Sequence, residues 1–119
     1  MDLNALQEKL RAFAAARNWG QFHTPKNLSM ALMVEAAELM ELFQWQTPEE
    51  SRAAKLDPAF KVRIGEELAD VLLYLLQLAD HTDVDLVKAV EDKLVKNGKK
   101  HPVPENQAVA AVATDGDRN

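Results

Sequence analysis

The sequence contains no cysteine and has few of the glycines, serines and histidines on which many enzyme motifs depend. Without cysteine there are no disulfide bonds, thiolate metal sites or cysteine nucleophiles. Its four glycines lie too far apart for a dinucleotide-binding fingerprint or a phosphate-binding loop. Neither Ser29 nor Ser51 lies in a nucleophile elbow, and the three histidines are too widely spaced for a helical zinc pair. The carboxylates are the groups left to carry chemistry.

Long apolar segments and an excess of positive charge are also missing. No unbroken apolar run exceeds six residues, whereas a membrane-spanning helix needs about 20. The first residues lack the basic and apolar regions of a secretory signal. The formal net charge is −5 at pH 7, and general nucleic-acid binding normally needs a basic surface. We therefore expect a cytoplasmic protein without a membrane or nucleic-acid partner.

The apolar residues recur at helical spacing, and strand alternation does not occur. The expected helices are 3–17, a second capped by Asn27 and ending near 46, a short one after Thr47, a long one from Asp57-Pro58 to about His81, and a last one opened by Asp83 and closed by Asn97-Gly98. After residue 102 the composition offers neither caps nor an amphipathic face. The sequence predicts an all-α four-helix bundle over residues 1–102 and a flexible C-terminal tail over residues 103–119.

Two pairs of carboxylates have a spacing that places their oxygens on one helix face. Glu35 and Glu38 lie three residues apart on the second helix, and Glu67 and Asp70 lie three apart on the long one. An acidic pair of this kind is most often a solvated surface. Here the surroundings are different, because segments 31–40 and 71–76 are apolar on nearly every side.

Helices with such surroundings are expected to be buried, and a buried carboxylate without a partner is unfavourable. No lysine or arginine occurs between Met30 and Glu50 to neutralise the first pair. Four converging carboxylates without histidine favour a hard divalent cation, Mg²⁺ or Mn²⁺. The structural alternative is a set of buried carboxyl groups that stay partly protonated, with raised pKa values and no metal.

The ordered motifs resemble a known family, the all-α nucleoside triphosphate pyrophosphohydrolases, often called MazG-like. Its signature of E-x-x-E followed by E-x-x-D is matched by Glu35 to Glu38 and by Glu67 to Asp70. Segments 19–28, 41–45 and 66–74 are similar to the branch that includes the deoxycytidine triphosphate (dCTP) pyrophosphatases. The resemblance covers about residues 3–102.

This resemblance implies an enzyme that cleaves between the α and β phosphates of a (deoxy)nucleoside triphosphate. The products are the monophosphate and pyrophosphate, the expected substrate is dCTP or a modified dCTP, and the expected role is nucleotide-pool house-cleaning. It also implies that Glu35, Glu38, Glu67 and Asp70 bind the Mg²⁺ or Mn²⁺ ions. Glu38 and Glu35 are the expected catalytic pair, with Glu38 orienting the attacking water.

The same resemblance implies a set of substrate-binding residues. Those expected at the nucleoside are Trp19, His23, Trp45 and Tyr74, and those expected at the phosphates are Lys93, Lys96, Asn97 and Lys100. Core packing is the alternative for the aromatic residues and is the favoured interpretation for Phe22. The lysines could instead be cations attracted to the negative end of a helix.

Segment 71–76 is apolar on every helical face, which is more than a chain of this size can easily cover. We therefore expect a homodimer or homotetramer. Two other functions remain open: a non-catalytic helical interaction module, and a pyrophosphohydrolase that acts on a phosphoribosyl nucleotide. Metal-dependent turnover of a triphosphate would distinguish the first of these from the enzyme.

Overall fold

The computed structural model describes residues 2–104, which are helical wherever they have regular secondary structure. The elements are α1 (Leu3–Ala16), α2 (Pro25–Glu41), α3 (Pro48–Arg52), the 3₁₀ helix η1 (Ala53–Leu56), α4 (Pro58–His81) and α5 (Leu86–Lys100). The expected all-α class is confirmed. Residues 105–119 of the expected tail lie outside the described residues. The chain divides into two compact units, Met1–Val84 and the part from Asp85 onward.

Two helix starts follow from capping chemistry that the sequence predicts. Thr47 and Glu50 form a capping box at α3, in which each side chain accepts a hydrogen bond of 3.1 Å from the other's backbone N–H. The Asp57 carboxylate accepts from the Phe60 N–H at 3.2 Å and so caps α4. Both predicted starts are confirmed.

The predicted bounds of α2 are wrong at both ends. Thr24 is the N-cap, accepting from the Asn27 N–H at 3.1 Å, and Pro25 fills the first turn, where its missing N–H is not needed. Asn27 instead lies inside the helix and donates from its side chain to the Phe22 carbonyl at 2.9 Å. The helix ends at Glu41, and residues 42–45 form turns.

The predicted limits of α5 are also wrong. Asp85 caps α5 by accepting from the Lys88 N–H at 3.0 Å, whereas Asp83 adopts a left-handed conformation (φ 54°) just after α4. The helix continues through Asn97 and Gly98, and the His101 N–H donates to the Asn97 carbonyl at 2.9 Å. Basic residues in the last turn favour this longer helix, because they face its negative end.

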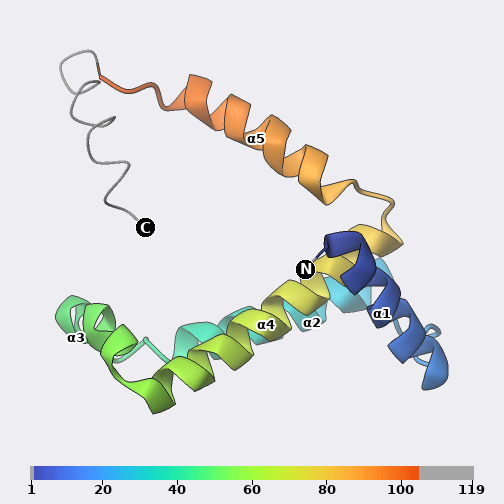
Figure 1. The fold of residues 1–119 in the computed structure, drawn as a ribbon, viewed down its shortest axis with the longest axis horizontal. Coiled ribbons are helices and arrows are strands. Elements are labelled where there is room, and N and C mark those ends of the chain that lie inside the picture. Colours follow the sequence, from blue (N-terminus) through green and yellow to red (C-terminus); the bar gives the residue numbers. More distant parts are fainter. Residues whose placement is uncertain (1, 105–119) are drawn as a thin grey trace. The chain divides into compact units, whose positions relative to one another are not determined.

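Within the first unit, α2 and α4 lie side by side, and α1 packs against the C-terminal part of α4 (Figure 1). Leu28 of α2 and Leu76 of α4 are fully buried. Polar contacts fix α1 on α4: the Gln7 amide donates to the Leu76 carbonyl at 3.0 Å, and Arg11 forms two hydrogen bonds of 2.7 and 2.8 Å with the Asp80 carboxylate. This packing positions the carboxylates of α2 and α4 and the cavity beside them.

Large apolar side chains remain uncovered on the outer faces of this unit. Those more than half exposed on α2 and α4 are Met30, Met33, Val34, Met40, Val62 and Leu68. The expectation that α2 is buried on nearly every side is therefore wrong for the single chain, because α4 covers only one of its faces. No helix among the described residues has the length and apolar character needed to span a membrane.

Candidate functional site

Three of the four predicted carboxylates meet between α2 and α4. Glu35 and Glu38 extend from α2 and Glu67 from α4, and one oxygen of each lies within 4.8 Å of the others. The three-residue spacing places Glu35 and Glu38 on one face of α2, and the pairing of α2 with α4 adds Glu67. We call these three residues the carboxylate cluster.

The carboxylate cluster contains buried oxygens that lack hydrogen-bond partners. The Oε2 atoms of Glu35 and Glu67 are both buried, and no described residue bonds to either. Glu38 is exposed. Burial raises the pKa of Glu35 to about 7; a hydrogen bond with Glu38 and the charges of Glu38, Asp70 and Glu67 contribute further. Burial and the neighbouring carboxylates also raise the pKa of Glu67.

This arrangement fits a divalent cation. Oxygen-only ligands on two helices suit Mg²⁺ or Mn²⁺, and such an ion would satisfy the buried oxygens of Glu35 and Glu67. Without a cation, the raised pKa of Glu35 lets this carboxyl hold a proton near neutral pH and donate a hydrogen bond to Glu38. The same geometry is therefore consistent with the protonated alternative that the sequence left open.

Asp70, the fourth predicted ligand, lies one turn beyond Glu67 on α4 and is not part of the carboxylate cluster. It lines a cavity of about 160 Å³ between α1, the loop after it and α4. The other residues that line this cavity are Leu10, Phe13 and Ala14 from α1, Trp19 and His23 from the loop, and Leu73, Tyr74 and Gln77 from α4.

Aromatic side chains form much of the wall of this cavity. Trp19 packs edge-on against Phe13, with ring centroids 5.6 Å apart, and lies 6.2 Å from the His23 ring. Tyr74, on α4, also lines the cavity. The structure thus brings Trp19, His23 and Tyr74, three of the predicted nucleoside contacts, to one cavity with Asp70.

Two other aromatic residues are placed differently. Trp45 follows α2, is 89% exposed and does not line the cavity. Phe22 is 59% exposed, so the favoured interpretation of core packing for this residue is wrong. A loop that turns sharply between α1 and α2 leaves Phe22 on the surface, whereas His23 faces inward.

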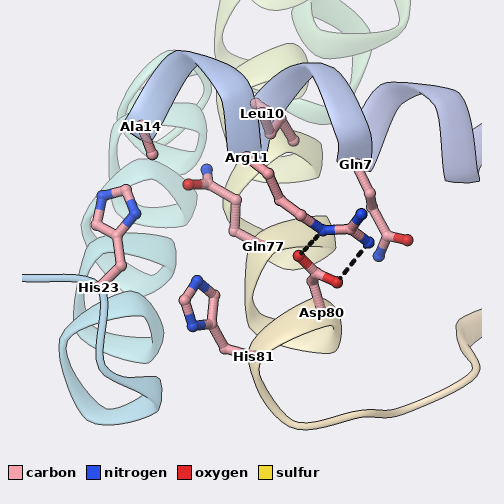
Figure 2. A pocket seen from close by; sticks show the side chains of 8 residues that line it. All are labelled: Gln7, Leu10, Arg11, Ala14, His23, Gln77, Asp80 and His81. Atoms are coloured by element: carbon pink, nitrogen blue, oxygen red, sulfur yellow. Dashed lines mark hydrogen bonds and ion pairs between the residues drawn. The ribbon is translucent and has the colours of Figure 1, made fainter. Parts of the chain in front are cut away.

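Sequence reasoning missed the polar residues where α1 meets α4. A smaller cavity there is lined by Arg11, Asp80, His81 and Gln77, among others (Figure 2). The His81 and His23 rings meet edge to face, with centroids 6.2 Å apart, and Arg11 lowers the pKa of Asp80 by its hydrogen bonds and charge. Gln77 could have been found from its spacing, because it follows Tyr74 by three residues on α4.

The predicted phosphate-binding residues lie on α5, in the second unit. Lys93, Lys96, Asn97 and Lys100 are all exposed. The three lysines recur at spacings of three and four residues, which places them along one face of α5. Their assignment to the phosphates stays a prediction.

Comparison with known proteins gives a family and several relatives. The family model described as "MazG-like family" matches residues 30–115. The dCTP pyrophosphatase 1 of Rattus norvegicus is 44% identical over 103 residues, which are 87% of this chain and 61% of that protein. That of Homo sapiens is 47% identical over 90 residues, 76% of this chain and 53% of that protein. The chain thus spans less than two thirds of the length of these curated relatives.

A solved structure shows the same fold over most of its length. The crystal structure of a pyrophosphatase from Archaeoglobus fulgidus superposes with a TM-score of 0.74 and 39% sequence identity. The match covers 84% of this chain and 92% of the archaeal one.

Proposed function

Because this chain belongs to the MazG-like family, we propose that it hydrolyses deoxynucleoside triphosphates, with dCTP or a modified dCTP as substrate, to the monophosphate and pyrophosphate. The names of the relatives, dCTP pyrophosphatase 1 and a pyrophosphatase, support this proposal. The observation that carries it is the carboxylate cluster beside an aromatic cavity. Such an enzyme would act in the clean-up of the nucleotide pool.

The carboxylate cluster is the proposed metal site. Glu35, Glu38 and Glu67 would hold Mg²⁺ or Mn²⁺, and Asp70 would be a fourth ligand, as the family resemblance implies. A bound divalent ion supplies charge neutralisation for the triphosphate and makes a bound water more acidic. Without that neutralisation, these carboxylates would repel a substrate of the same charge.

Glu38 is the residue that we assign to orienting the attacking water, with Glu35 beside it. Glu38 is the exposed member of the carboxylate cluster, so a water molecule can reach its oxygens from solvent. The water oxygen forms a new bond to the α phosphorus and passes a proton to Glu38, the bond from this phosphorus to the oxygen that bridges to the β phosphate breaks, and pyrophosphate leaves. Lys93, Lys96, Asn97 and Lys100 are proposed phosphate contacts, since their charge and amide groups suit phosphate oxygens.

The aromatic cavity is the proposed nucleoside site. Trp19 and His23 offer ring faces against which a base can stack. Tyr74 follows Asp70 by four residues, so its ring lies on the same face of α4 and can border the sugar. Trp45 is kept as a fourth contact from the family resemblance, although it does not line the cavity of the single chain.

We also propose that the protein is a cytoplasmic homodimer or homotetramer. The uncovered apolar side chains of α2 and α4 support self-association, because a second copy could bury them. The mass measured by light scattering at micromolar concentration tests this assembly. A monomeric mass would contradict it.

The experiment that tests the catalytic proposal is a panel of nucleoside triphosphates, assayed for pyrophosphate release with Mg²⁺ and with EDTA. We expect release from dCTP with Mg²⁺ and none in EDTA. No release from any triphosphate would favour the interaction module, whereas turnover of a phosphoribosyl nucleotide alone would favour the other alternative. Full activity in EDTA would contradict the role of the metal.

A further inference from the structure

The aromatic cavity contains the carboxamide of Gln77, a polar group to which the proposed function assigns no role. Asp70, Tyr74 and Gln77 all line the cavity and follow one another along one face of α4. Gln77 follows Asp70 by seven residues, which corresponds to a rise of about 10 Å along the helix. A nucleotide whose phosphates lie near Asp70 and whose sugar borders Tyr74 would therefore place its base at the level of Gln77.

Within the aromatic cavity the side chains around Gln77 are apolar except for the His23 ring, and Gln77 also lines the smaller cavity with Arg11, Asp80 and His81. Leu10 and Ala14 face it from α1, Leu73 lies beside it on α4, and the His23 ring lies in the loop. Among the described residues that line the cavity, Gln77 is the only carboxamide. An apolar wall distinguishes bases by size, but it cannot distinguish an amino group from a carbonyl group at the same ring position.

A hydrogen bond fixes the orientation of the Gln77 carboxamide. Its Nε2 donates to the Leu73 carbonyl at 3.1 Å. Because that carbonyl can only accept, the nitrogen must face it, and Oε1 must face away. Figure 2 shows the Gln77 side chain extending from α4 toward α1, on the side where Ala14 and His23 lie. Within residues 2–104 no donor is bonded to Oε1, so this oxygen is available to a ligand.

We propose that Gln77 determines base specificity by accepting a hydrogen bond from the exocyclic amino group of cytosine. Uracil and thymine carry a carbonyl oxygen at this position, which would face the Oε1 acceptor without a hydrogen between them. The bond to Leu73 opposes the amide rotation that would otherwise accommodate either base. The proposal rests on the proposed function and adds to it the residue and the chemical group that distinguish the substrate.

The test compares dCTP with dUTP, which share sugar and triphosphate and have the same ring size. The variant is Gln77→Met, which keeps an unbranched side chain of similar length that suits a helix but has no acceptor of comparable strength. We expect the ratio of kcat/KM for dCTP to that for dUTP to fall by about tenfold or more, because dCTP loses a hydrogen bond that dUTP never makes. The control is Gln21→Met, the same substitution at an exposed loop glutamine that does not line the cavity, which should leave the ratio nearly unaltered.

Two outcomes would overturn the inference and keep the proposed function intact. One is wild-type protein that hydrolyses both substrates while Gln77→Met retains the wild-type ratio. The other arises if the variant loses all turnover: binding of dCMP and dUMP is then measured by calorimetry, and an equal loss of affinity for both assigns Gln77 a purely structural role. Wild-type protein that releases pyrophosphate from no nucleotide would instead refute the proposed function itself.

Discussion

Glu35 on α2 and Glu67 on α4 each have a buried carboxylate oxygen that no described residue hydrogen-bonds, and both belong to the same cluster. Two such groups disfavour the pairing of their helices unless a cation or a proton intervenes. Perturbed carboxyl groups beside a cavity are typical of functional sites. The pair therefore links the fold to the proposed chemistry, and the first two predictions depend on it.

The first prediction concerns the ligands. Replacing Glu35 or Glu67 with Gln should lower Mg²⁺-dependent pyrophosphate release by about 100-fold or more, because charge stabilisation by a bound metal is worth several kcal/mol. The control is Glu41→Gln, which removes an exposed carboxylate of α2 outside the cluster and should leave turnover nearly unchanged. Equal losses in all three variants would contradict the assignment.

The second prediction concerns pH. The pKa of Glu35 is about 7 in the folded chain against an ordinary value of 4.5. Between these values the folded state binds a proton that the unfolded state has lost. The stability that this proton contributes is fully present below the ordinary pKa and is lost as the pH rises through 7.

Thermal unfolding in EDTA at about pH 5 and about pH 8 tests the direction in which stability changes with pH. The wild-type protein should lose more stability toward the higher pH than Glu35→Gln, whose amide does not titrate. Mg²⁺ should raise the melting temperature of the wild type more at the higher pH, where its ligands are ionised. A pH dependence unchanged by Glu35→Gln would show that another group is responsible.

The third prediction concerns the core of the first unit. Leu28 is 1% exposed, so Leu28→Ala should lower the free energy of unfolding by about 2–5 kcal/mol, the usual result of leaving a cavity. Leu56 is 76% exposed, so Leu56→Ala should change the free energy of unfolding by less than about 0.5 kcal/mol. Urea unfolding at one protein concentration measures the free energy of unfolding of both variants. Similar losses in the two variants would show that the two positions are equally buried in solution.

The fourth prediction concerns the sugar. If the Tyr74 ring borders C2′, it leaves no space for a ribose hydroxyl, and the enzyme should prefer dCTP over CTP. A 100-fold preference corresponds to about 2.7 kcal/mol of differential transition-state binding. Tyr74→Phe keeps the ring and should keep the preference, whereas Tyr74→Ala should reduce it. Equal kcat/KM for dCTP and CTP in the wild type would contradict the proposal that the Tyr74 ring excludes a ribose hydroxyl.

Local chemistry explains which parts of the fold the sequence could predict. Thr47 and Asp57 cap helices through their own side chains, so their signals are complete within four residues. Thr24 and Pro25 carry a local signal of the same kind, since proline is favoured in the first turn of a helix, and the predicted start at Asn27 overlooks it. Asp83 has the residue type of a cap, but the end of α4 holds it in a left-handed conformation.

The site was predictable only where it depends on spacing along one helix. The spacing of Glu35 and Glu38 predicts a shared face, and the structure confirms that face. Which residues of α4 join them depends on how the two helices pack, and of the predicted pair only Glu67 does. The spacing of Gln77 from Tyr74 places both residues on one face of α4, but only the packing of α1 on α4 makes that face part of a cavity wall. The residues where α1 meets α4, such as Arg11 and Asp80, have no comparable signal within one helix.

The central claim is that the carboxylate cluster binds a divalent metal ion, and a Mn²⁺ titration followed by electron paramagnetic resonance tests it most directly. The signal of free Mn²⁺ should be depleted by the wild-type protein and restored by excess Mg²⁺. The doubly substituted variant with Glu35→Gln and Glu67→Gln should leave that signal close to its value in buffer, because it lacks two of the three clustered carboxylates. Equal depletion by the wild type and the variant would place the metal elsewhere and contradict the account.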